Sequence, residues 1–206
     1  MKILKFTFVL LITGLFASCT QPKPVKSIEN LKAAISGETG AKAKYTLFAQ
    51  IAQNEGYPNI SKMFTAAAAA EAVHIKNHNA ALVKLGEKEF EATLPEIQSG
   101  TTAENLKAAI EGETYEYTTM YPGFIEAAKT ENSAVSTTTF TWAKDAEKKH
   151  AQLYSAALAS LTDKGNDNEV SSAWYVCLKC GNLYNNITGV QSCEFCGTSS
   201  TAFQVF

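Results

Sequence analysis

The chain has 206 residues, of which 46% are hydrophobic and 10% aromatic, so it can bury a folded core and is not a disordered protein. Its formal charge of −2 at pH 7 argues against a nucleic-acid partner held by a basic surface. The length suits one domain of medium size followed by a smaller unit.

The first residues have the pattern of an export signal. A lysine-containing start precedes the apolar run Phe6–Phe16, which is too short to span a membrane as a mature helix. The run ends in FASC, and small residues before Cys19 resemble the lipobox of bacterial lipoproteins, in which the cysteine is lipidated. We therefore predict a signal peptide over 1–18 and a lipidated tether over 19–27, on an exported protein anchored at the non-cytoplasmic side of a membrane (facing the periplasm in a Gram-negative cell). A simple cleaved signal and a retained apolar anchor are the alternatives.

The middle of the chain contains an internal repeat. NLKAAISGET at 30–39 returns as NLKAAIEGET at 105–114, an offset of 75 residues. EAVH at 71–74 returns as EKKH at 147–150, an offset of 76 residues. A nearly constant offset indicates one duplicated structural unit, which the helical spacing of its apolar residues identifies as a helical hairpin.

Apolar periodicity and breakers predict four helices, a longer connection in the middle and a small terminal unit. The connection at Lys88–Gly100 is long for a turn and suits a crossover between two hairpins, the pattern of a ferritin-like four-helix bundle over 28–161. Pro122 falls inside the third helix and should bend it or widen its turns locally. We expect a mainly α protein, with a flexible linker at 162–172 and a second domain at 173–206. The predicted helices are Ile28–Glu55, Asn59–Leu85, Thr102–Glu131 and Ala134–Leu161.

Each repeat contributes one glutamate in a GET sequence and one Glu-x-x-His pair. A spacing of three residues places the glutamate and histidine of a pair on one helix face, so both side chains can reach one ion. For a single pair, a solvated helix face is the ordinary explanation, but the full set in this order is the ligand set of di-iron and di-manganese bundles. Carboxylates with imidazole suit iron or manganese. The predicted ligands are Glu38, Glu71, His74, Glu113, Glu147 and His150.

Two further residues of the bundle stand outside this plan. His78 follows His74 by one helical turn and is interpreted as a surface residue or a support for the ligands, with metal ligation a minor alternative. Glu116 lies three residues after Glu113 and therefore shares its helix face. The first repeat has Ala41 at the position equivalent to Glu116, so the second hairpin carries one additional carboxylate.

The last 30 residues contain two CxxCG sequences. Four thiolates at this spacing form a tetrahedral metal site, with each glycine allowing a close backbone turn. Iron and zinc both suit these ligands, and disulfides are a third interpretation in an exported protein. The predicted ligands are Cys177, Cys180, Cys193 and Cys196, surrounded by a small core of Trp174, Tyr175, Tyr184, Phe195 and Phe203.

A ferritin-like bundle with an ExxE pattern in its third helix, followed by a rubredoxin-like knuckle domain, resembles rubrerythrin. The resemblance covers Ile28–Phe206 and is especially close at GETYEYTTMYPGF, residues 112–124, with Glu116 at the position of the family's additional iron ligand. Tyr45 and Tyr121 match tyrosines that family members place beside the di-iron centre, where we expect them to support catalysis. Glu194 replaces a usual proline, and the lipobox departs from relatives that are mostly cytoplasmic.

The resemblance implies a peroxidase of oxidative-stress defence that reduces hydrogen peroxide to water at two non-haem irons. Electrons from an unidentified donor would enter through an Fe(Cys)4 centre, with zinc as the alternative metal there. It also implies that Glu116 holds one iron in the oxidised state and His74 holds it in the reduced state. Family members are homodimers or larger, with the Fe(Cys)4 centre of one subunit near the di-iron site of another. A ferroxidase or O2-reducing oxidase, and a non-enzymatic zinc-knuckle binding protein, are the competing functions.

Overall fold

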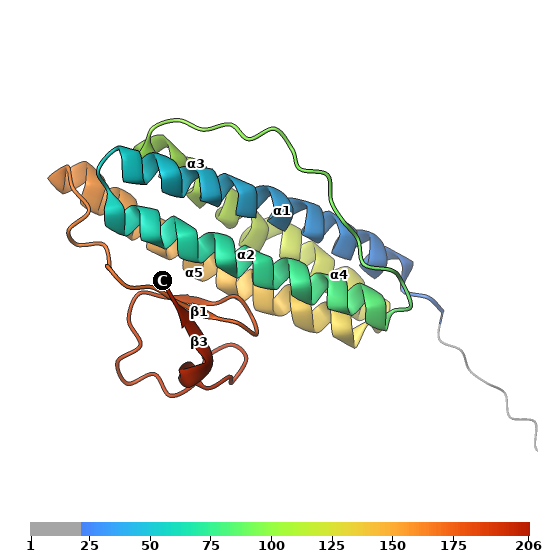
Figure 1. Cartoon of the computed structure of the whole chain (residues 1–206). Coiled ribbons are helices and arrows are strands. Elements are labelled where there is room, and N and C mark those ends of the chain that lie inside the picture. The colour runs from blue at the N-terminus through green and yellow to red at the C-terminus, as the bar shows by residue number, and fades with distance from the viewer. Residues whose placement is uncertain (1–21) are drawn as a thin grey trace, which may run out of the picture.

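The computed structural model describes residues 22–206, so the predicted signal peptide and Cys19 lie outside the described residues. Two long hairpins of helices pack into a four-helix bundle, which confirms the predicted mainly α, ferritin-like fold (Figure 1). Within residues 22–206, no helix combines the length and the apolar character needed to cross a membrane. The helices are α1 (Val25–Asn54), α2 (Pro58–Lys84), α3 (Thr102–Tyr115), α4 (Tyr121–Thr130) and α5 (Ala134–Lys164).

The helix ends follow from local chemistry. α1 begins at Val25, directly after Pro24, so three residues of the predicted tether are helical. α3 begins with a capping box, in which the Thr101 side chain accepts from the Glu104 N–H and the Glu104 carboxylate accepts from the Thr101 N–H. α5 continues three residues past the predicted end and stops at Gly165, whose φ of 63° is left-handed.

The predicted third helix is divided by a five-residue π-helix, η1 (Glu116–Met120), which ends directly before α4. Pro122 has no N–H group, and in a regular α-helix its ring would clash with the carbonyl of Thr118. A wider turn avoids this clash, and the N–H of Tyr121 donates to the Glu116 carbonyl five residues earlier. The prediction that Pro122 widens the helix is therefore confirmed, and the wide turn begins at Glu116.

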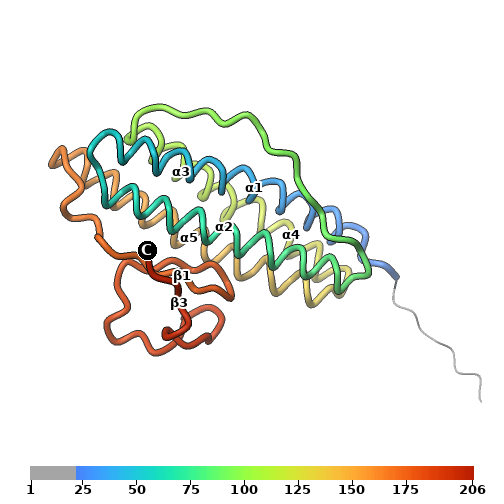
Figure 2. The backbone as a smooth tube through the Cα atoms, viewed as in Figure 1, coloured from blue at the N-terminus to red at the C-terminus, as the bar shows by residue number. Residues whose placement is uncertain are grey.

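The crossover between the hairpins has no helix or strand and runs over α1 and α3 (Figure 2). Its first end is held by Asn79, whose side chain accepts from the N–H of Phe90 at 2.7 Å. Its second end is held by Asn105, whose side chain bonds both backbone groups of Gly100. The crossover is therefore fastened at both ends to helices of the bundle.

The terminal domain is a three-stranded antiparallel sheet in the order β2-β1-β3, built from β1 (Tyr175–Cys177), β2 (Leu183–Tyr184) and β3 (Phe203–Val205), with a 3-10 turn η2 (Ser200–Ala202) before β3. Tyr184 and Phe203 pack beside the cysteines, as predicted. Trp174 differs from the prediction, because it joins the core of the bundle together with Val176 and Leu183. The small domain therefore lies directly against α2 and α5 (Figure 1).

The linker between the domains is tied down. The buried carboxylate of Asp167 accepts hydrogen bonds from the backbone N–H groups of Asn59 and Ile60, at 2.6 and 3.1 Å. These N–H groups belong to the first turn of α2, where no helical partner is available to them. The prediction of a flexible linker is wrong at this point, because Asp167 serves as the missing cap of α2.

Candidate metal centres

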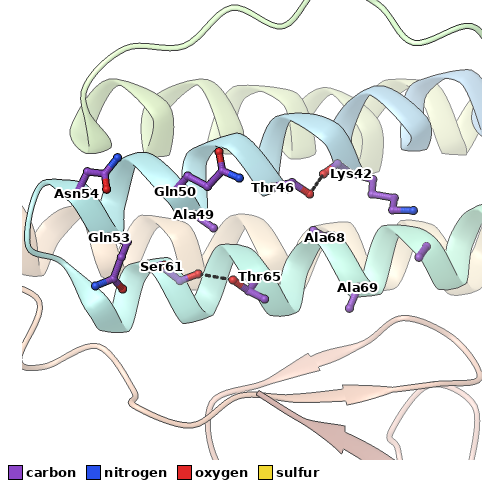
Figure 3. A pocket seen from close by; sticks show the side chains of 11 residues that line it. Lys42, Thr46, Ala49, Gln50, Gln53, Asn54, Ser61, Thr65, Ala68 and Ala69 are labelled. Atoms are coloured by element: carbon purple, nitrogen blue, oxygen red, sulfur yellow. Dashed lines mark hydrogen bonds between the residues drawn. The ribbon is translucent and has the colours of Figure 1, made fainter.

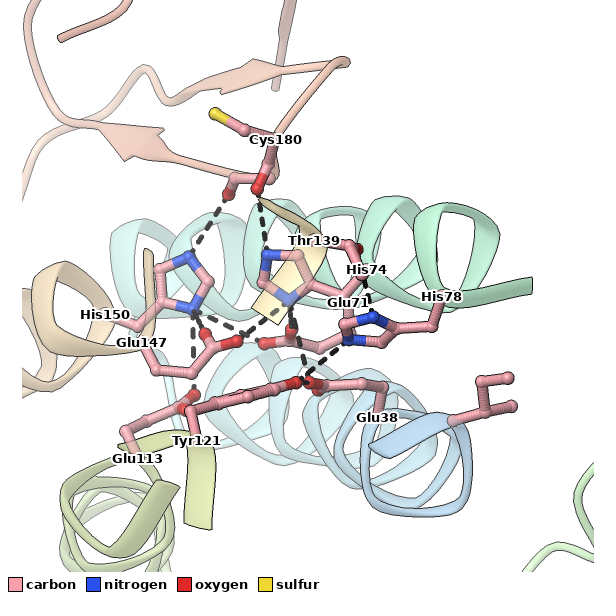
Figure 4. Close-up of polar contacts among 12 residues, drawn as sticks. Glu38, Glu71, His74, His78, Glu113, Tyr121, Thr139, Glu147, His150 and Cys180 are labelled. Atoms are coloured by element: carbon pink, nitrogen blue, oxygen red, sulfur yellow. Dashed lines mark hydrogen bonds and ion pairs between the residues drawn. The ribbon is translucent and has the colours of Figure 1, made fainter. Parts of the chain in front are cut away.

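The six predicted carboxylate and histidine ligands meet in the middle of the bundle, and each is at most 2% exposed. Glu38, Glu71, His74 and Glu147 form one group of ligand atoms within 4.8 Å of one another. Glu71, Glu113, Glu147 and His150 form a second such group. Glu71 and Glu147 belong to both groups, which is the arrangement of two neighbouring ions bridged by shared carboxylates (Figure 4).

The two histidines face the shared carboxylates through their Nδ1 atoms. His74 Nδ1 lies 2.8 Å from Glu71 Oε2 and 2.9 Å from Glu147 Oε1. His150 Nδ1 lies 2.8 Å from Glu147 Oε2 and 3.4 Å from Glu71 Oε1. This orientation follows from the Glu-x-x-His spacing on α2 and α5, which puts each histidine one turn from its own glutamate.

The pKa values of these buried carboxylates are shifted in opposite directions. Burial, together with repulsion from Glu147 and Glu71, holds the pKa of Glu38 well above its usual range. Burial and repulsion from Glu147 raise the pKa of Glu113 to about 8. Burial also opposes ionisation of Glu71, but the neighbouring His150 and His74 lower its pKa to about 2. The protein alone therefore cannot hold this many negative charges together.

Unpaired atoms identify what the cluster accommodates. Within residues 22–206, several buried atoms of the cluster make no well-aligned hydrogen bond despite their short separations: Glu38 Oε2, Glu71 Oε1, both carboxylate oxygens of Glu147 and His150 Nδ1. Such atoms are costly unless a cation contacts them. Oxygen donors with imidazole nitrogen suit iron, so the residues fit a di-iron site.

Glu38 and Glu113, which each belong to only one of the two ligand groups, are held by tyrosines. Tyr45 Oη donates to Glu113 Oε1 at 2.5 Å, and Tyr121 Oη donates to Glu38 Oε1. Burial raises the pKa of each phenol well above its usual range, so both keep their protons. The structure thus places both sequence-predicted tyrosines in direct contact with the cluster.

His78 is fully buried, so its interpretation as a surface residue is wrong. His78 Nε2 lies 3.1 Å from Tyr121 Oη, and His78 Nδ1 lies 3.0 Å from Thr139 Oγ1. Burial and the nearby His74 lower the pKa of His78 to about 3, so its ring is neutral. Because Tyr121 donates its own proton to Glu38, it accepts from His78 Nε2. Thr139 was missed by sequence reasoning, since a threonine within a helix carries no signal of its own.

Glu116 lies beside the cluster but belongs to neither group of ligand atoms. Its Oε2 atom is buried and has no hydrogen-bond partner among the described residues, and burial with repulsion from Glu38 holds its pKa well above the usual range. In this structure His74, and not Glu116, completes the group around Glu38.

The four cysteines form a second site. The Sγ atoms of Cys177 and Cys196 are 3.5 Å apart, and those of Cys180 and Cys193 are also 3.5 Å apart. A disulfide requires about 2.05 Å, so the disulfide interpretation is wrong for these four free cysteines. All four sulfurs lie within 4.8 Å of one another, as a tetrahedral metal site requires.

The unusual Glu194 has a local role in the second knuckle. Its backbone N–H donates to Tyr184 Oη at 3.2 Å, a hydrogen bond that proline cannot make. Its carboxylate accepts from Asn182 Nδ2 at 3.3 Å. The departure from the usual proline therefore leaves the cysteine geometry in place.

The two sites are joined by direct contacts. His74 Nε2 donates to the carbonyl of Cys180 at 3.1 Å, and His150 Nε2 donates to the carbonyl of Gly181 at 3.4 Å (Figure 4). Gly181 has a φ of 82°, and a Cβ atom there would lie only 2.2 Å from His74 Nε2. Within this chain the two sites are therefore in direct contact, and the approach between subunits that the resemblance implies stays a prediction.

Comparisons with known proteins agree with this geometry. The Rubrerythrin family model matches residues 29–158. A nigerythrin of Nitratidesulfovibrio vulgaris is 35% identical, covering 87% of this chain and 86% of that protein. A rubrerythrin of Porphyromonas gingivalis is 32% identical, covering 88% of this chain and 90% of that protein. A structure of nigerythrin in a mixed-valence state aligns with a TM-score of 0.76 at 37% identity, over 87% of this chain and 86% of the other.

The helical bundle also resembles a more distantly related solved structure. A bacterioferritin structure from Desulfovibrio desulfuricans aligns with a TM-score of 0.65 at 18% identity, over 69% of this chain and 84% of the other, which shows the fold only. The family match and the relatives above 30% identity, in contrast, cover most of the chain. The carboxylate–histidine cluster and the four cysteines fit two irons and one iron, respectively. The chain therefore belongs to the rubrerythrin family and is a di-iron oxidoreductase of oxidative-stress defence.

Proposed function

We propose that this protein is a peroxidase that reduces hydrogen peroxide to water with electrons relayed through its Fe(Cys)4 site. The observation that carries the proposal is the hydrogen bond from His74 to the carbonyl of Cys180, because it connects a residue of each site directly. Two irons supply the two electrons that cleavage of an O–O bond needs, and a thiolate-bound iron passes electrons singly.

The chain's residues divide this work. Glu38, Glu71, His74, Glu113, Glu147 and His150 are proposed as ligands of the di-iron site. The carbonyls of Cys180 and Gly181 accept from the histidine Nε2 atoms, which fixes the rings so that Nδ1 faces the cluster. Tyr45 and Tyr121 hold protons at Oη beside the carboxylates and orient them.

Glu116 is proposed as the ligand that distinguishes the oxidised from the reduced state. An anionic carboxylate favours ferric iron, whereas a neutral imidazole tolerates ferrous iron well. Its place beside the cluster, with one oxygen buried and unpaired, supports this role. Structures of the oxidised and the reduced protein with identical metal–ligand distances at Glu116 and His74 would contradict it.

The oxidant is tested by measuring peroxide and O2 consumption by the iron-loaded protein under the same donor. We expect kcat/KM for hydrogen peroxide to exceed that for O2. Faster consumption of O2 would instead make the protein an oxidase or ferroxidase. Metal analysis with a visible spectrum decides between iron and zinc at the cysteines, since only iron colours that site, and a colourless zinc site without turnover would favour a binding protein.

We also propose that the protein is an exported lipoprotein held to a membrane at Cys19, on the strength of the FASC sequence. A Cys19→Ser variant should leave the membrane fraction and lose incorporation of labelled fatty acid. An unchanged distribution of that variant would remove the proposal. The physiological form is proposed to be a homodimer or larger, which the molar mass in solution checks.

A further inference from the structure

The di-iron cluster is closed on the side of the small domain. His74 Nε2 and His150 Nε2 are in hydrogen-bond contact with the carbonyls of Cys180 and Gly181, at 3.1 and 3.4 Å. No molecule fits between atoms at these distances. A small oxidant must therefore reach the cluster from another side of the bundle.

A cavity of about 490 Å³ lies on the other side, between α1, α3 and the crossover. Two residues of the metal site form part of its wall, namely Glu116 and Tyr45. Glu38, Glu71, Glu113 and Glu147 are all buried, whereas Glu116 is partly exposed. Of the cluster carboxylates, Glu116 is thus the one that this cavity exposes.

Small residues keep the space in front of Glu116 open. Gly37 and Gly112 occupy equivalent positions of the two repeats, at the offset of 75, and both line the cavity. Ala41, the repeat equivalent of Glu116, lines it as well. A Cβ atom at Gly37 would lie 3.8 Å from Glu116 Oε1, so the α1 wall is already in contact range of this carboxylate.

The crossover covers this cavity without filling it. Pro95 approaches Gly40 of α1 so closely that a Cβ there would lie 3.3 Å from Pro95 Cγ. The neighbouring residues Glu96 and Gln98 complete the outer wall. A second cavity, of about 700 Å³, opens between α1 and α2, but no residue of the cluster lines it (Figure 3).

We propose that the cavity between α1 and α3 is the entrance and binding site for hydrogen peroxide, with Glu116 at its inner end. This rests on the proposed peroxidase function. Its volume of about 490 Å³ greatly exceeds the ~30 Å³ share of a water molecule, so it has room for a small neutral peroxide. Oxidant and electrons then approach the di-iron cluster from opposite sides.

The test fills the cavity from its wall. A Cβ at Gly112 would meet no atom of residues 22–206 within 4 Å, so Gly112→Leu adds a side chain into open space. Gly123→Leu is the matched control, because Gly123 is also helical and unobstructed but does not line the cavity. Ala41→Leu is a second variant that narrows the cavity from α1.

In the iron-loaded protein, Gly112→Leu and Ala41→Leu should lower kcat/KM for hydrogen peroxide by about tenfold or more. Cumene hydroperoxide, a bulkier oxidant, should be affected more strongly than hydrogen peroxide. Iron content and thermal stability should remain those of the Gly123→Leu control.

Binding of azide to the oxidised protein, followed by its absorption, separates this proposal from the peroxidase function. If the parent protein lacks peroxide turnover, the function fails, but slower azide binding in the filled variants still supports the entrance. Unchanged azide and peroxide rates in those variants overturn it, as does an equal loss in Gly123→Leu. The proposal would also be overturned if both filled variants lost iron while the Gly123→Leu control kept it, because a side chain in an open cavity should not disturb the ligands.

Discussion

Gly181 offers a sharp test of the contact between the two metal sites. Its α-carbon faces α2, so that in Gly181→Ala the new methyl group would lie 2.2 Å from His74 Nε2 and 3.1 Å from the carbonyl of Ala70. Ordinary non-bonded contacts require the knuckle to retreat by about 1 Å. The 3.1 Å hydrogen bond between His74 and Cys180 would then exceed hydrogen-bond range.

The expected loss of stability in Gly181→Ala has two parts. The positive φ of 82° costs alanine about 1–2 kcal/mol relative to glycine. The lost hydrogen bond costs about 0.5–1.5 kcal/mol more. Gly197→Ala carries the first part alone, because Gly197 has a φ of 71° in the second knuckle and a Cβ there would meet no atom within 4 Å in the part of the chain that the structure describes. The two variants therefore differ by the contact with His74.

The assay reduces the protein anaerobically, mixes it with hydrogen peroxide and follows the returning colour of the oxidised Fe(Cys)4 site. We expect Gly181→Ala to recover this colour more slowly than Gly197→Ala. In urea unfolding, Gly181→Ala should be less stable than Gly197→Ala by the cost of the lost hydrogen bond alone. Equal recovery rates in the two variants would refute the reasoning that electrons cross at this contact.

Other residues give further predictions. Asp167→Ala should lower the free energy of unfolding by about 1–2 kcal/mol through loss of the α2 cap, measured in urea against the exposed Asp163→Ala; equal effects would contradict the cap. Burial would raise the pKa of Glu131, but hydrogen bonds from the first residues of α1 lower it below 4.5 overall. Its stabilisation is therefore present above pH 4.5 and lost as pH falls through the lowered pKa, so Glu131→Gln should flatten the acid dependence of Tm, and an unchanged profile would oppose this. Glu116→Ala should reduce peroxide turnover about tenfold or more while iron content matches that of the exposed Glu111→Ala, whereas equal losses of iron and turnover would make Glu116 an ordinary ligand.

The metal sites were largely predictable from sequence because their spacing is local. A glutamate and a histidine three residues apart share a helix face wherever the helix packs, and the repeat supplied the partner pair. Pro122 likewise predicted the wide turn, since the effect of its missing N–H is confined to its own helix.

Long-range packing was not predictable in the same way. Trp174 is a large apolar residue that would suit the core of either domain, so the sequence does not assign it to one. Only the docking of the sheet on α2 and α5 places it in the core of the bundle. His78 is buried because Tyr121 and Thr139 of other helices satisfy its ring, which no local pattern records. Asp167 caps a helix that begins 109 residues earlier, at Pro58.

The most direct test of the peroxidase relay replaces iron with zinc at the four cysteines while keeping iron in the bundle. Zinc cannot accept an electron, so turnover of hydrogen peroxide by an external donor should be lost. A single turnover should survive when the di-iron site is reduced beforehand. Equal steady-state peroxide turnover by the zinc and iron forms would contradict the account.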